Sequence, residues 1–302
     1  MSLSWLSLMR TLRSIALIFS TLVVGCARAP SPLAPNVDGS IGMPHRGVLS
    51  GGAVLPPQGP GYRWLRQDDR HHGLPRFVRA IERAAAQVER EQPGGTLSVG
   101  DLSARRGGQL LPHLSHRTGR DADLLLYMTT LEGAPVVSPG FVHVGPDGLA
   151  WDPQGKRYLR FDVARTWLLV RALLEDPDAR IQWVFVHHNV EALLVEWARA
   201  RGDSPQTIVR AMEVMLEPHP GGPHDDHVHV RTACSGEELA LGCEHTGPVR
   251  AWLDPDGPNR AALDVAAVPT DAELLAELFR PFGSPRAAEA KLGSSNAKPA
   301  TP

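Results

Sequence analysis

The segment at residues 224–231, His-Asp-Asp-His-Val-His-Val-Arg, constrains the fold more than any other part of the chain. It holds three histidines in six residues, and a single valine separates His227 from His229. Successive side chains of a β-strand face opposite sides, so both imidazoles point to one face while Val228 and Val230 point into a core. Two imidazoles side by side can share a metal ion.

A second polar cluster precedes this segment by about a hundred residues. It contains His116 and, seven positions later, Asp123, with Gly119 between them to allow a turn. Asp123 is followed by three leucines, and an unpaired carboxylate on such a strand is costly to bury unless a cation accompanies it. Taken singly, the first cluster could be a surface turn and the His-x-His pair could be structural. Together they offer two histidines and one aspartate, the ligand set of a hydrolytic zinc site with an open fourth position.

Composition limits the function classes. The chain has 302 residues, of which 42% are hydrophobic and 21% charged, as in ordinary globular proteins. The net charge of −2 gives no electrostatic case for nucleic acid as a partner.

The N-terminus is typical of an export signal. Two arginines precede a short apolar run over residues 14–25, which ends at Cys26 and resembles a bacterial lipoprotein signal with Cys26 as the lipidated residue. The alternative is an ordinary signal peptide that is cleaved near Ala27 or Ala29. In an exported protein, Cys234 and Cys243 are expected to form a disulfide worth about 2–3 kcal/mol.

Periodicity predicts a mixture of helices and strands without regular βαβ alternation. The expected helices cover residues 75–91, 162–175 (capped by Asp162), 190–201 (capped by Asn189), 204–216 and 271–279, and the expected strands cover 96–101, 123–128, 158–161, 181–187 and 227–232. This pattern predicts an α+β fold in which a central antiparallel β-sheet carries the zinc site and is surrounded by helices and loops.

The ordered motifs resemble those of a known family. The pattern His-x6-Asp followed by His-x-His is similar to the signature of the zinc peptidases that include lysostaphin-type and D-Ala-D-Ala-cleaving enzymes. Within that group, roughly residues 39–255 resemble the penicillin-insensitive murein endopeptidases. The motifs that carry the resemblance are Gly39-Ser40-Ile41-Gly42, Val99-Gly100-Asp101-Leu102-Ser103, Ser115-His116-Arg117-Thr118-Gly119, Asp121-Ala122-Asp123, Phe161-Asp162-Val163-Ala164-Arg165, His227-Val228-His229-Val230-Arg231 and Leu241-Gly242-Cys243.

The resemblance implies roles for particular residues. It implies that His116, Asp123 and His229 bind zinc, that His227 is the catalytic histidine, acting as base or as stabiliser of the oxyanion, and that His224 is a further active-site histidine. The implied reaction is hydrolysis of D-alanyl–meso-diaminopimelyl cross-links between peptidoglycan stem peptides. No serine nucleophile is needed, so β-lactams would not inhibit the reaction.

The resemblance also points to an extra metal-binding position. His113 is similar to an extra metal-binding residue of the family, but Ala150 stands where a histidine partner is expected. A second metal is therefore not expected. Arg120 and Arg231 flank the motifs and could hold a substrate carboxylate or be solvated surface residues, and the loop 103–109 is expected to line the cleft.

The resulting organisation has four segments: a signal peptide (1–26), a linker (27–40), a zinc peptidase domain (41–282) and a disordered tail (283–302). The expected location is the periplasm or cell envelope, with a lipid anchor at Cys26. Ala27, which follows this cysteine, does not resemble an inner-membrane retention signal and so favours the outer membrane. Two alternatives remain open at this point, a zinc D,D-carboxypeptidase or dipeptidase and a non-catalytic cell-wall-binding lipoprotein.

Overall fold

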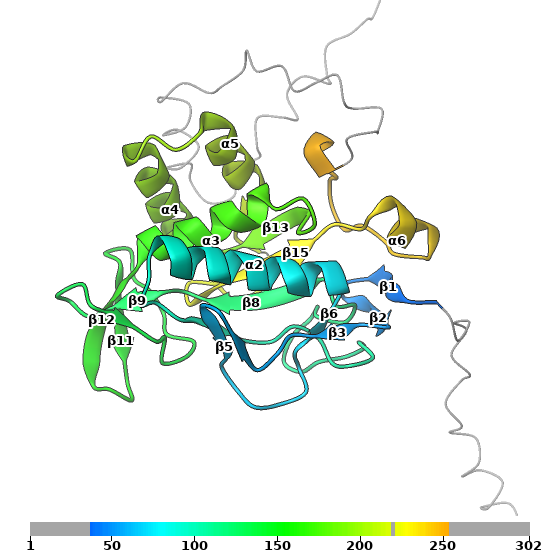
Figure 1. Cartoon of the computed structure of the whole chain (residues 1–302), viewed down its shortest axis with the longest axis horizontal. Coiled ribbons are helices and arrows are strands. Elements are labelled where there is room, and N and C mark those ends of the chain that lie inside the picture. The colour runs from blue at the N-terminus through cyan, green and yellow to red at the C-terminus, as the bar shows by residue number, and fades with distance from the viewer. Residues whose placement is uncertain (1–36, 219–220, 254–302) are drawn as a thin grey trace, which may run out of the picture. The chain divides into compact units, whose positions relative to one another are not determined.

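The computed structural model describes residues 37–218 and 221–253 (Figure 1). Several predicted features lie outside these residues: the signal segment 1–26 with Cys26, most of the linker 27–40, the helix 271–279 and the tail 283–302. The first described strand, β1, begins at Gly39.

The largest sheet has seven strands in the order β14-β13-β15-β8-β7-β5-β4. Their bounds are β4 (Gln58–Gly59), β5 (Tyr62–Trp64), β7 (Leu97–Val99), β8 (Asp121–Leu125), β13 (Ile181–Phe185), β14 (Met215–Leu216) and β15 (His227–Thr232). Strands β13, β15, β8 and β7 pair antiparallel, as predicted for the sheet that carries the histidines. The prediction of a wholly antiparallel sheet is wrong, because β14 is parallel to β13 and β5 is parallel to β7. In each parallel pair, a segment that contains helices connects the two strands, and such a crossover lets the second strand run in the same direction as the first.

Three smaller sheets surround the large one. In the first, β1 (Gly39–Met43) pairs with β2 (Arg46–Ser50), and in the second, β3 (Ala53–Val54) pairs with β6 (His72–Gly73). The third has four strands in the order β10-β9-β12-β11, which are β9 (Met128–Thr129), β10 (Pro135–Val136), β11 (Leu149–Asp152) and β12 (Arg157–Phe161). The fold is therefore a mixed α/β arrangement of several sheets rather than one central sheet.

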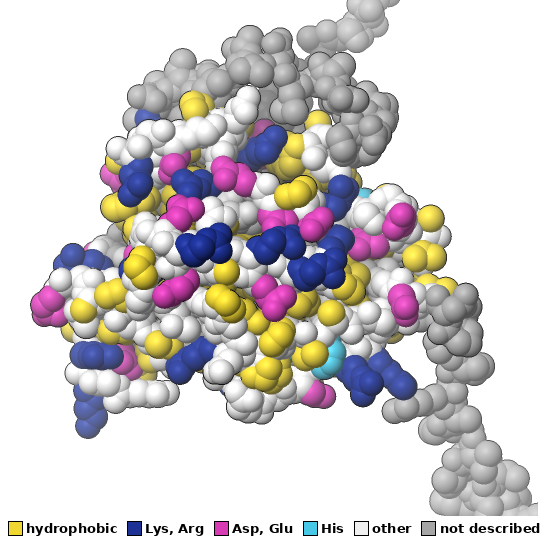
Figure 2. Space-filling view, viewed as in Figure 1, with side chains coloured by type: hydrophobic (Ala, Val, Ile, Leu, Met, Phe, Trp, Pro, Cys, Tyr) yellow, Lys and Arg dark blue, Asp and Glu magenta, His cyan; other side chains and the backbone are white. Residues whose placement is uncertain are grey.

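The helices of the described chain are α2 (Pro75–Glu91), α3 (Val163–Glu175), α4 (His188–Ala200), α5 (Pro205–Val214) and α6 (Gly236–Ala240), and a 3-10 turn covers Ala251–Leu253. The helices form a layer in which α2 contacts α3, and α3 contacts α4 and α5, while α6 lies against strand β1. Figure 1 shows α2 and α3 lying side by side along the sheet, with α4 and α5 beyond α3. Figure 2 shows basic and acidic side chains interspersed over the face that carries α2, without a patch of one sign.

Helices α2 and α3 begin as the sequence predicts. Pro75 occupies the first turn of α2, where its missing N–H costs nothing, and the apolar stripe of this helix is buried. Asp162 caps α3 by accepting a hydrogen bond from the backbone N–H of Arg165 at 3.1 Å.

The ends of two other helices differ from the prediction. Asn189 does not cap α4; His187 does, because its backbone is extended and its Nδ1 accepts the N–H of Asn189 at 3.2 Å. Helix α5 ends at Val214, and residues 215–216 instead form the parallel edge strand β14 beside β13.

The histidine strand β15 has two chemically different faces. Val228 and Val230 are fully buried in the main core together with Ala122 and Leu124 of the neighbouring strand β8. The strand period of two therefore turns the histidines of β15 to the opposite face, away from this core. This confirms the predicted orientation of the two valines.

Candidate metal centre

Strands β8 and β15 bring the two polar clusters together. Their antiparallel register sets His229 opposite Asp123 and Arg231 opposite Asp121. Directly opposite residues of a pair share a face, so two carboxylates, an imidazole and a guanidinium lie side by side. The register thus joins motifs that are about a hundred residues apart in the sequence.

His116 reaches this face from the loop before β8. Its backbone is left-handed, with φ of 62°, and its N–H donates to Asp121 Oδ2 at 3.2 Å, which holds the loop against the strand. Nδ1 of His116 donates to the carbonyl of Leu102 at 2.5 Å. Nε2 is left with its lone pair 3.2 Å from Asp123 Oδ1.

His229 is oriented in the same manner by a carboxylate. Its Nε2 donates to Asp121 Oδ1 at 2.8 Å, and its Nδ1 lies 3.6 Å from Asp123 Oδ1. Asp121 is fully buried and also accepts a hydrogen bond from Arg231 Nε at 2.6 Å. Burial opposes ionisation of Asp121, but Arg231 and His229 outweigh it and hold its pKa well below the ordinary value. A carboxylate on the distal nitrogen of an imidazole is the arrangement that orients metal-binding histidines.

His227 and His113 each turn one ring nitrogen toward Asp123. Nδ1 of His227 donates to Asp226 Oδ1 at 2.5 Å, and its Nε2 lies 3.4 Å from Asp123 Oδ1. Nε2 of His113 donates to Asp101 Oδ2 at 2.7 Å, and its Nδ1 lies 3.8 Å from Asp123 Oδ2. In each ring a carboxylate holds the distal nitrogen, so the nitrogen that faces Asp123 can bind a metal ion in its deprotonated form.

His224 lies beside these rings rather than against Asp123. Its ring centroid is 4.8 Å from that of His227 and 5.5 Å from that of His229. Its backbone is left-handed, with φ of 52°, and Nδ1 donates to the carbonyl of Gly222 at 2.6 Å. Burial lowers the pKa of His224, so its Nε2 is available as a neutral base.

The centre of the cluster contains polar atoms with no hydrogen-bond partner. Within the described chain, His116 Nε2 and both carboxylate oxygens of Asp123 are buried and unpartnered. Burial opposes the charge of Asp123, but His116 and His227 outweigh it and keep its pKa well below the ordinary value. A buried carboxylate with neither oxygen hydrogen-bonded carries a large desolvation penalty. A bound cation removes that penalty, so these residues fit a metal ion, and their ligand atoms lie within 4.8 Å of one another in two groups, His113–His116–Asp123 and His224–His227–His229.

Two other groups in the described residues bring metal-ligating atoms together. One is His187 with His188 and Glu217, and the other is His143 with Asp225 and Asp226. In the first, Nδ1 of His187 accepts a hydrogen bond, so its Nε2 carries the proton and offers no lone pair. His187 has a structural role, since it caps α4.

The cluster opens into a cleft of about 990 Å3. Of the residues predicted from sequence to form the site, His113, Asp123, His224, His227 and His229 line the cleft, whereas His116 is fully buried behind it. The remaining walls come from residues distant in sequence: His45, Arg66, Arg70, Asp101, Leu111, Pro112, Leu114, Ser115, Phe141, Phe185, Pro218, Gly221, Gly222 and Arg231.

Two expectations about the cleft walls are wrong. The loop 103–109 does not line the cleft; the wall comes instead from the next stretch, 111–115. Arg120 is fully buried on the far side of β8, where Nη1 donates to Cys234 Sγ at 3.0 Å and Nη2 to the carbonyl of Glu244 at 2.6 Å. It therefore cannot bind a substrate carboxylate, and Arg231, although in the cleft, is paired with Asp121.

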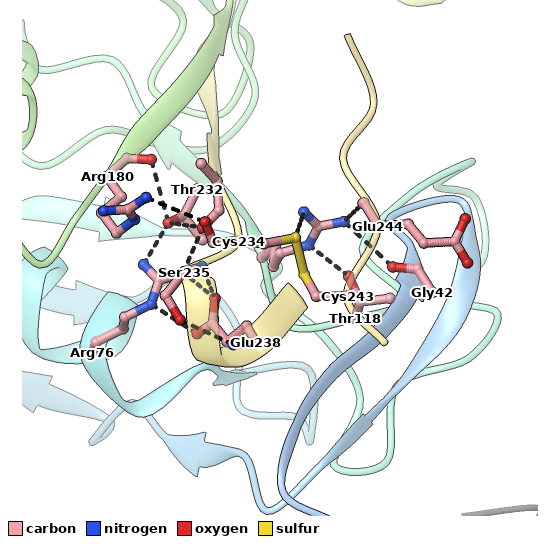
Figure 3. Close-up of a disulfide and its surroundings, with 12 residues drawn as sticks. Gly42, Arg76, Thr118, Arg180, Thr232, Cys234, Ser235, Glu238, Cys243 and Glu244 are labelled. Atoms are coloured by element: carbon pink, nitrogen blue, oxygen red, sulfur yellow. Dashed lines mark hydrogen bonds and ion pairs between the residues drawn. A yellow bond between two sulfur atoms is a disulfide. The ribbon is translucent and has the colours of Figure 1, made fainter. Parts of the chain in front are cut away.

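A disulfide anchors the chain that leaves β15 (Figure 3). Cys234 and Cys243 are joined as predicted. Between them, Ser235 and Glu238 form a capping box at the start of α6, and Glu238 accepts two hydrogen bonds at 2.8 Å from Arg76 of α2. The exit of the histidine strand is thus tied to the helical layer.

Sequence reasoning missed several residues of the site. Asp121 holds the imidazole of His229, Asp101 holds that of His113, and Arg66 and Arg70 line the cleft. A usable signal existed for Asp121, because it lies two positions before Asp123 and shares its face if the strand begins there. No local pattern marked the two arginines.

None of the helices in the described part of the chain is long and apolar enough to cross a membrane.

The comparisons with known proteins agree with this geometry. The sequence pattern of the family described as penicillin-insensitive murein endopeptidase matches residues 40–257. The chain is 26% identical over 285 residues to the penicillin-insensitive murein endopeptidase of Haemophilus influenzae, covering 88% of this chain and 91% of that protein. It is 27% identical over 242 residues to the protein of the same name from Klebsiella pneumoniae (73% and 78% covered) and 26% identical over 243 residues to that of Escherichia coli K12 (74% and 80% covered). The chain therefore belongs to the penicillin-insensitive murein endopeptidase family and is a metallopeptidase.

Proposed function

We propose that this metallopeptidase is a zinc-dependent D,D-endopeptidase that hydrolyses D-alanyl–meso-diaminopimelyl cross-links between peptidoglycan stem peptides. The observation that carries the proposal is the group of unpartnered buried atoms of His116 and Asp123, which face the free Nδ1 of His229. The peptidoglycan substrate agrees with the names of the relatives.

The donor set favours zinc among divalent metals. Two imidazole nitrogens and one carboxylate, from His116, His229 and Asp123, are typical of a catalytic zinc site that keeps one position open. Mg2+ and Ca2+ prefer sets made of oxygen alone. When bound, the zinc ion would lower the pKa of a bound water and polarise the scissile carbonyl.

His227 is the residue we assign to proton transfer. Asp226 accepts the proton on its Nδ1, so Nε2 faces the cleft as the basic nitrogen next to the ligand group. This nitrogen can take a proton from the attacking water and return it to the leaving amine. His224, whose ring is adjacent and whose Nε2 is a neutral base, would relay the proton.

His113 has the geometry of an additional ligand. Asp101 fixes its tautomer, and its free Nδ1 lies 3.8 Å from Asp123 Oδ2, whereas His227 faces the other carboxylate oxygen, Oδ1. We propose that it joins the coordination sphere of the same ion or contacts its bound water.

The remaining parts of the proposal concern location and boundaries. We propose a signal peptide at 1–26 with a lipid on Cys26, a linker at 27–40, the peptidase domain at 41–282 and a tail at 283–302. A lipid on Cys26 would hold the enzyme in the cell envelope, where its substrate lies, with the outer membrane favoured.

The reaction can be tested on purified cross-linked muropeptide dimers. We expect the zinc-loaded protein to convert dimers to monomers, a chelator to abolish the conversion, added zinc to restore it and penicillin to leave it unchanged. Mass spectrometry distinguishes the alternatives, because a carboxypeptidase would remove only a terminal D-alanine from an intact dimer. Bound zinc with no cleavage of any kind would indicate a cell-wall-binding protein instead.

A further inference from the structure

Two cationic side chains, those of Arg66 and Arg70, line the cleft into which the proposed metal site opens, and we call this pair the cationic arm. Arg66 and Arg70 follow strand β5 and line the cleft, with side chains that are 43% and 32% exposed. Both donate hydrogen bonds to Asp101, which is only 2% exposed. Asp101 also accepts from His113, so one buried carboxylate connects the two arginines to the cluster around Asp123.

The two guanidiniums are held in place but keep donors available. Arg66 uses Nη2 for Asp101 and lies with Nε 3.5 Å from Asp68, whereas Arg70 uses Nη1 for Asp101 and for the carbonyl of Leu111. Among the described residues, Nη1 of Arg66 and Nη2 of Arg70 have no hydrogen-bond acceptor. Side chains that are already fixed by neighbours lose little entropy when they bind an anion. The arm is therefore preorganised for a carboxylate.

Its place in the cleft is on the side of His227. The Arg66 guanidinium lies 5.9 Å from the centroid of the Phe141 ring, and Phe141 packs edge-on against His227 with centroids 5.2 Å apart. Phe141 thus lies beside both Arg66 and the proposed proton carrier His227. A substrate whose leaving nitrogen reaches His227 would extend its next atoms past Phe141 toward Arg66.

The proposed substrate has a carboxylate close to its leaving amine. The leaving amine of a diaminopimelyl cross-link sits on a carbon that carries a free carboxylate, and N–Cα–C geometry puts the carboxyl carbon about 2.5 Å from the scissile nitrogen. An arginine fork matches a carboxylate geometrically and can bind it through two hydrogen bonds. Arg231 is less suitable, because its Nε donates to Asp121 and its Nη1 to Thr246, and its side chain is 10% exposed compared with 43% for Arg66. Arg120 is buried outside the cleft.

We propose that Arg66, assisted by Arg70, binds the carboxylate next to the leaving amine and makes the enzyme selective for cross-links in which this group is a free acid. This inference rests on the proposed function, since it concerns the leaving side of the same bond. Loss of a charge-assisted hydrogen bond predicts a discrimination of roughly 10- to 100-fold against a substrate amidated at that carboxylate.

The test compares two cross-linked muropeptide dimers that differ only in this group, as free acid or amide, using the full-length chain in detergent with zinc bound. The readout is the ratio of kcat/KM for acid to that for amide. We expect a ratio of roughly 10 or more for the unaltered enzyme and a ratio near unity for Arg66→Gln, with the bound zinc content unchanged because Arg70 and His113 still hold Asp101.

Two further variants separate recognition from general damage. Arg63→Gln removes an exposed cation of strand β5 that does not line this cleft, and it should keep the ratio of the unaltered enzyme. Arg66→Lys keeps the charge but loses the forked guanidinium, so its acid-to-amide ratio of kcat/KM should fall between those of the unaltered enzyme and Arg66→Gln. Equal cleavage of acid and amide by the unaltered enzyme, or a full ratio in Arg66→Gln, would overturn the inference. Failure to cleave either dimer with zinc bound would instead overturn the proposed function.

Discussion

Asp121 is the residue whose replacement tests the architecture of the site most sharply. It is fully buried, and its carboxylate accepts hydrogen bonds from His229, from Arg231 and from the backbone of His116. Asp121→Asn keeps the shape but removes the charge that faces Arg231. Breaking a buried ion pair from one side costs roughly 3–5 kcal/mol, and we expect the lower end, about 3 kcal/mol, because the amide oxygen still accepts one hydrogen bond.

The same change should weaken metal binding. Replacing a carboxylate that orients a ligating imidazole typically lowers metal affinity by about 10- to 100-fold. Stability is measured by denaturant unfolding of the metal-free protein, and affinity by competition with a chelator of known strength. The matched control is Asp178→Asn, since Asp178 pairs with Arg83 at 3.0 Å but is 52% exposed, and such a pair is worth less than about 1 kcal/mol.

The dependence on pH gives an independent check. Arg231 and His229 outweigh the effect of burial and hold the pKa of Asp121 below that of the unfolded chain, which is about 3.9. Its contribution to stability is therefore fully present above pH of about 4 and is lost as the pH falls below that value. The difference in unfolding free energy between the unaltered protein and Asp121→Asn should narrow in acid. If Asp121→Asn matches the control in both stability and metal affinity at pH 7, Asp121 neither stabilises the fold through Arg231 nor orients His229 for the metal.

Three substitutions and one zinc titration have expected outcomes. His229→Ala should lose stoichiometric zinc by elemental analysis while His143→Ala, at an exposed ring, retains it; zinc retained by both would reject His229 as a ligand. His227→Ala should keep zinc but lower turnover of muropeptide dimers by roughly 10²- to 10⁴-fold, and an unchanged rate would remove it from proton transfer. Burial opposes the charge of His227, but Asp123 outweighs burial and raises the pKa of His227 to about 10 in the metal-free site. Zinc binding at pH 7 should therefore release protons, which calorimetry in buffers of different ionisation enthalpy measures. If no protons are released, zinc does not compete with a proton at this site. Cys26→Ser should move the protein from the membrane to the soluble fraction, and continued membrane association would argue against lipidation.

Local sequence patterns were sufficient to predict the strand that carries the histidines. Alternation of His and Val predicted its face, its core contacts and its bounds, because burial on one side fixes the register of a strand. The neighbouring strand was placed two residues late, starting at Asp123 instead of Asp121. That shift left the role of Asp121 unnoticed, although the residue was visible in the motif.

The rest of the site depends on contacts that no local pattern encodes. Arg66, Arg70 and Phe141 reach the cleft from loops outside the metal motifs, and their neighbours are set by the packing of separate sheets. The two parallel strand pairs were missed for a related reason. Strands β14 and β5 are short, and their direction follows from the helical crossovers that lead into the next strand rather than from their own residues.

The metal site is best tested by a crystal structure of the zinc-loaded protein, with anomalous diffraction measured on both sides of the zinc absorption edge. We expect one strong peak about 2.0–2.2 Å from His116 Nε2, His229 Nδ1 and an oxygen of Asp123. We expect no peak of comparable height at His187, His188 and Glu217. A zinc ion at that second group, with the cluster around Asp123 empty, would show that His116, His229 and Asp123 are not the zinc ligands.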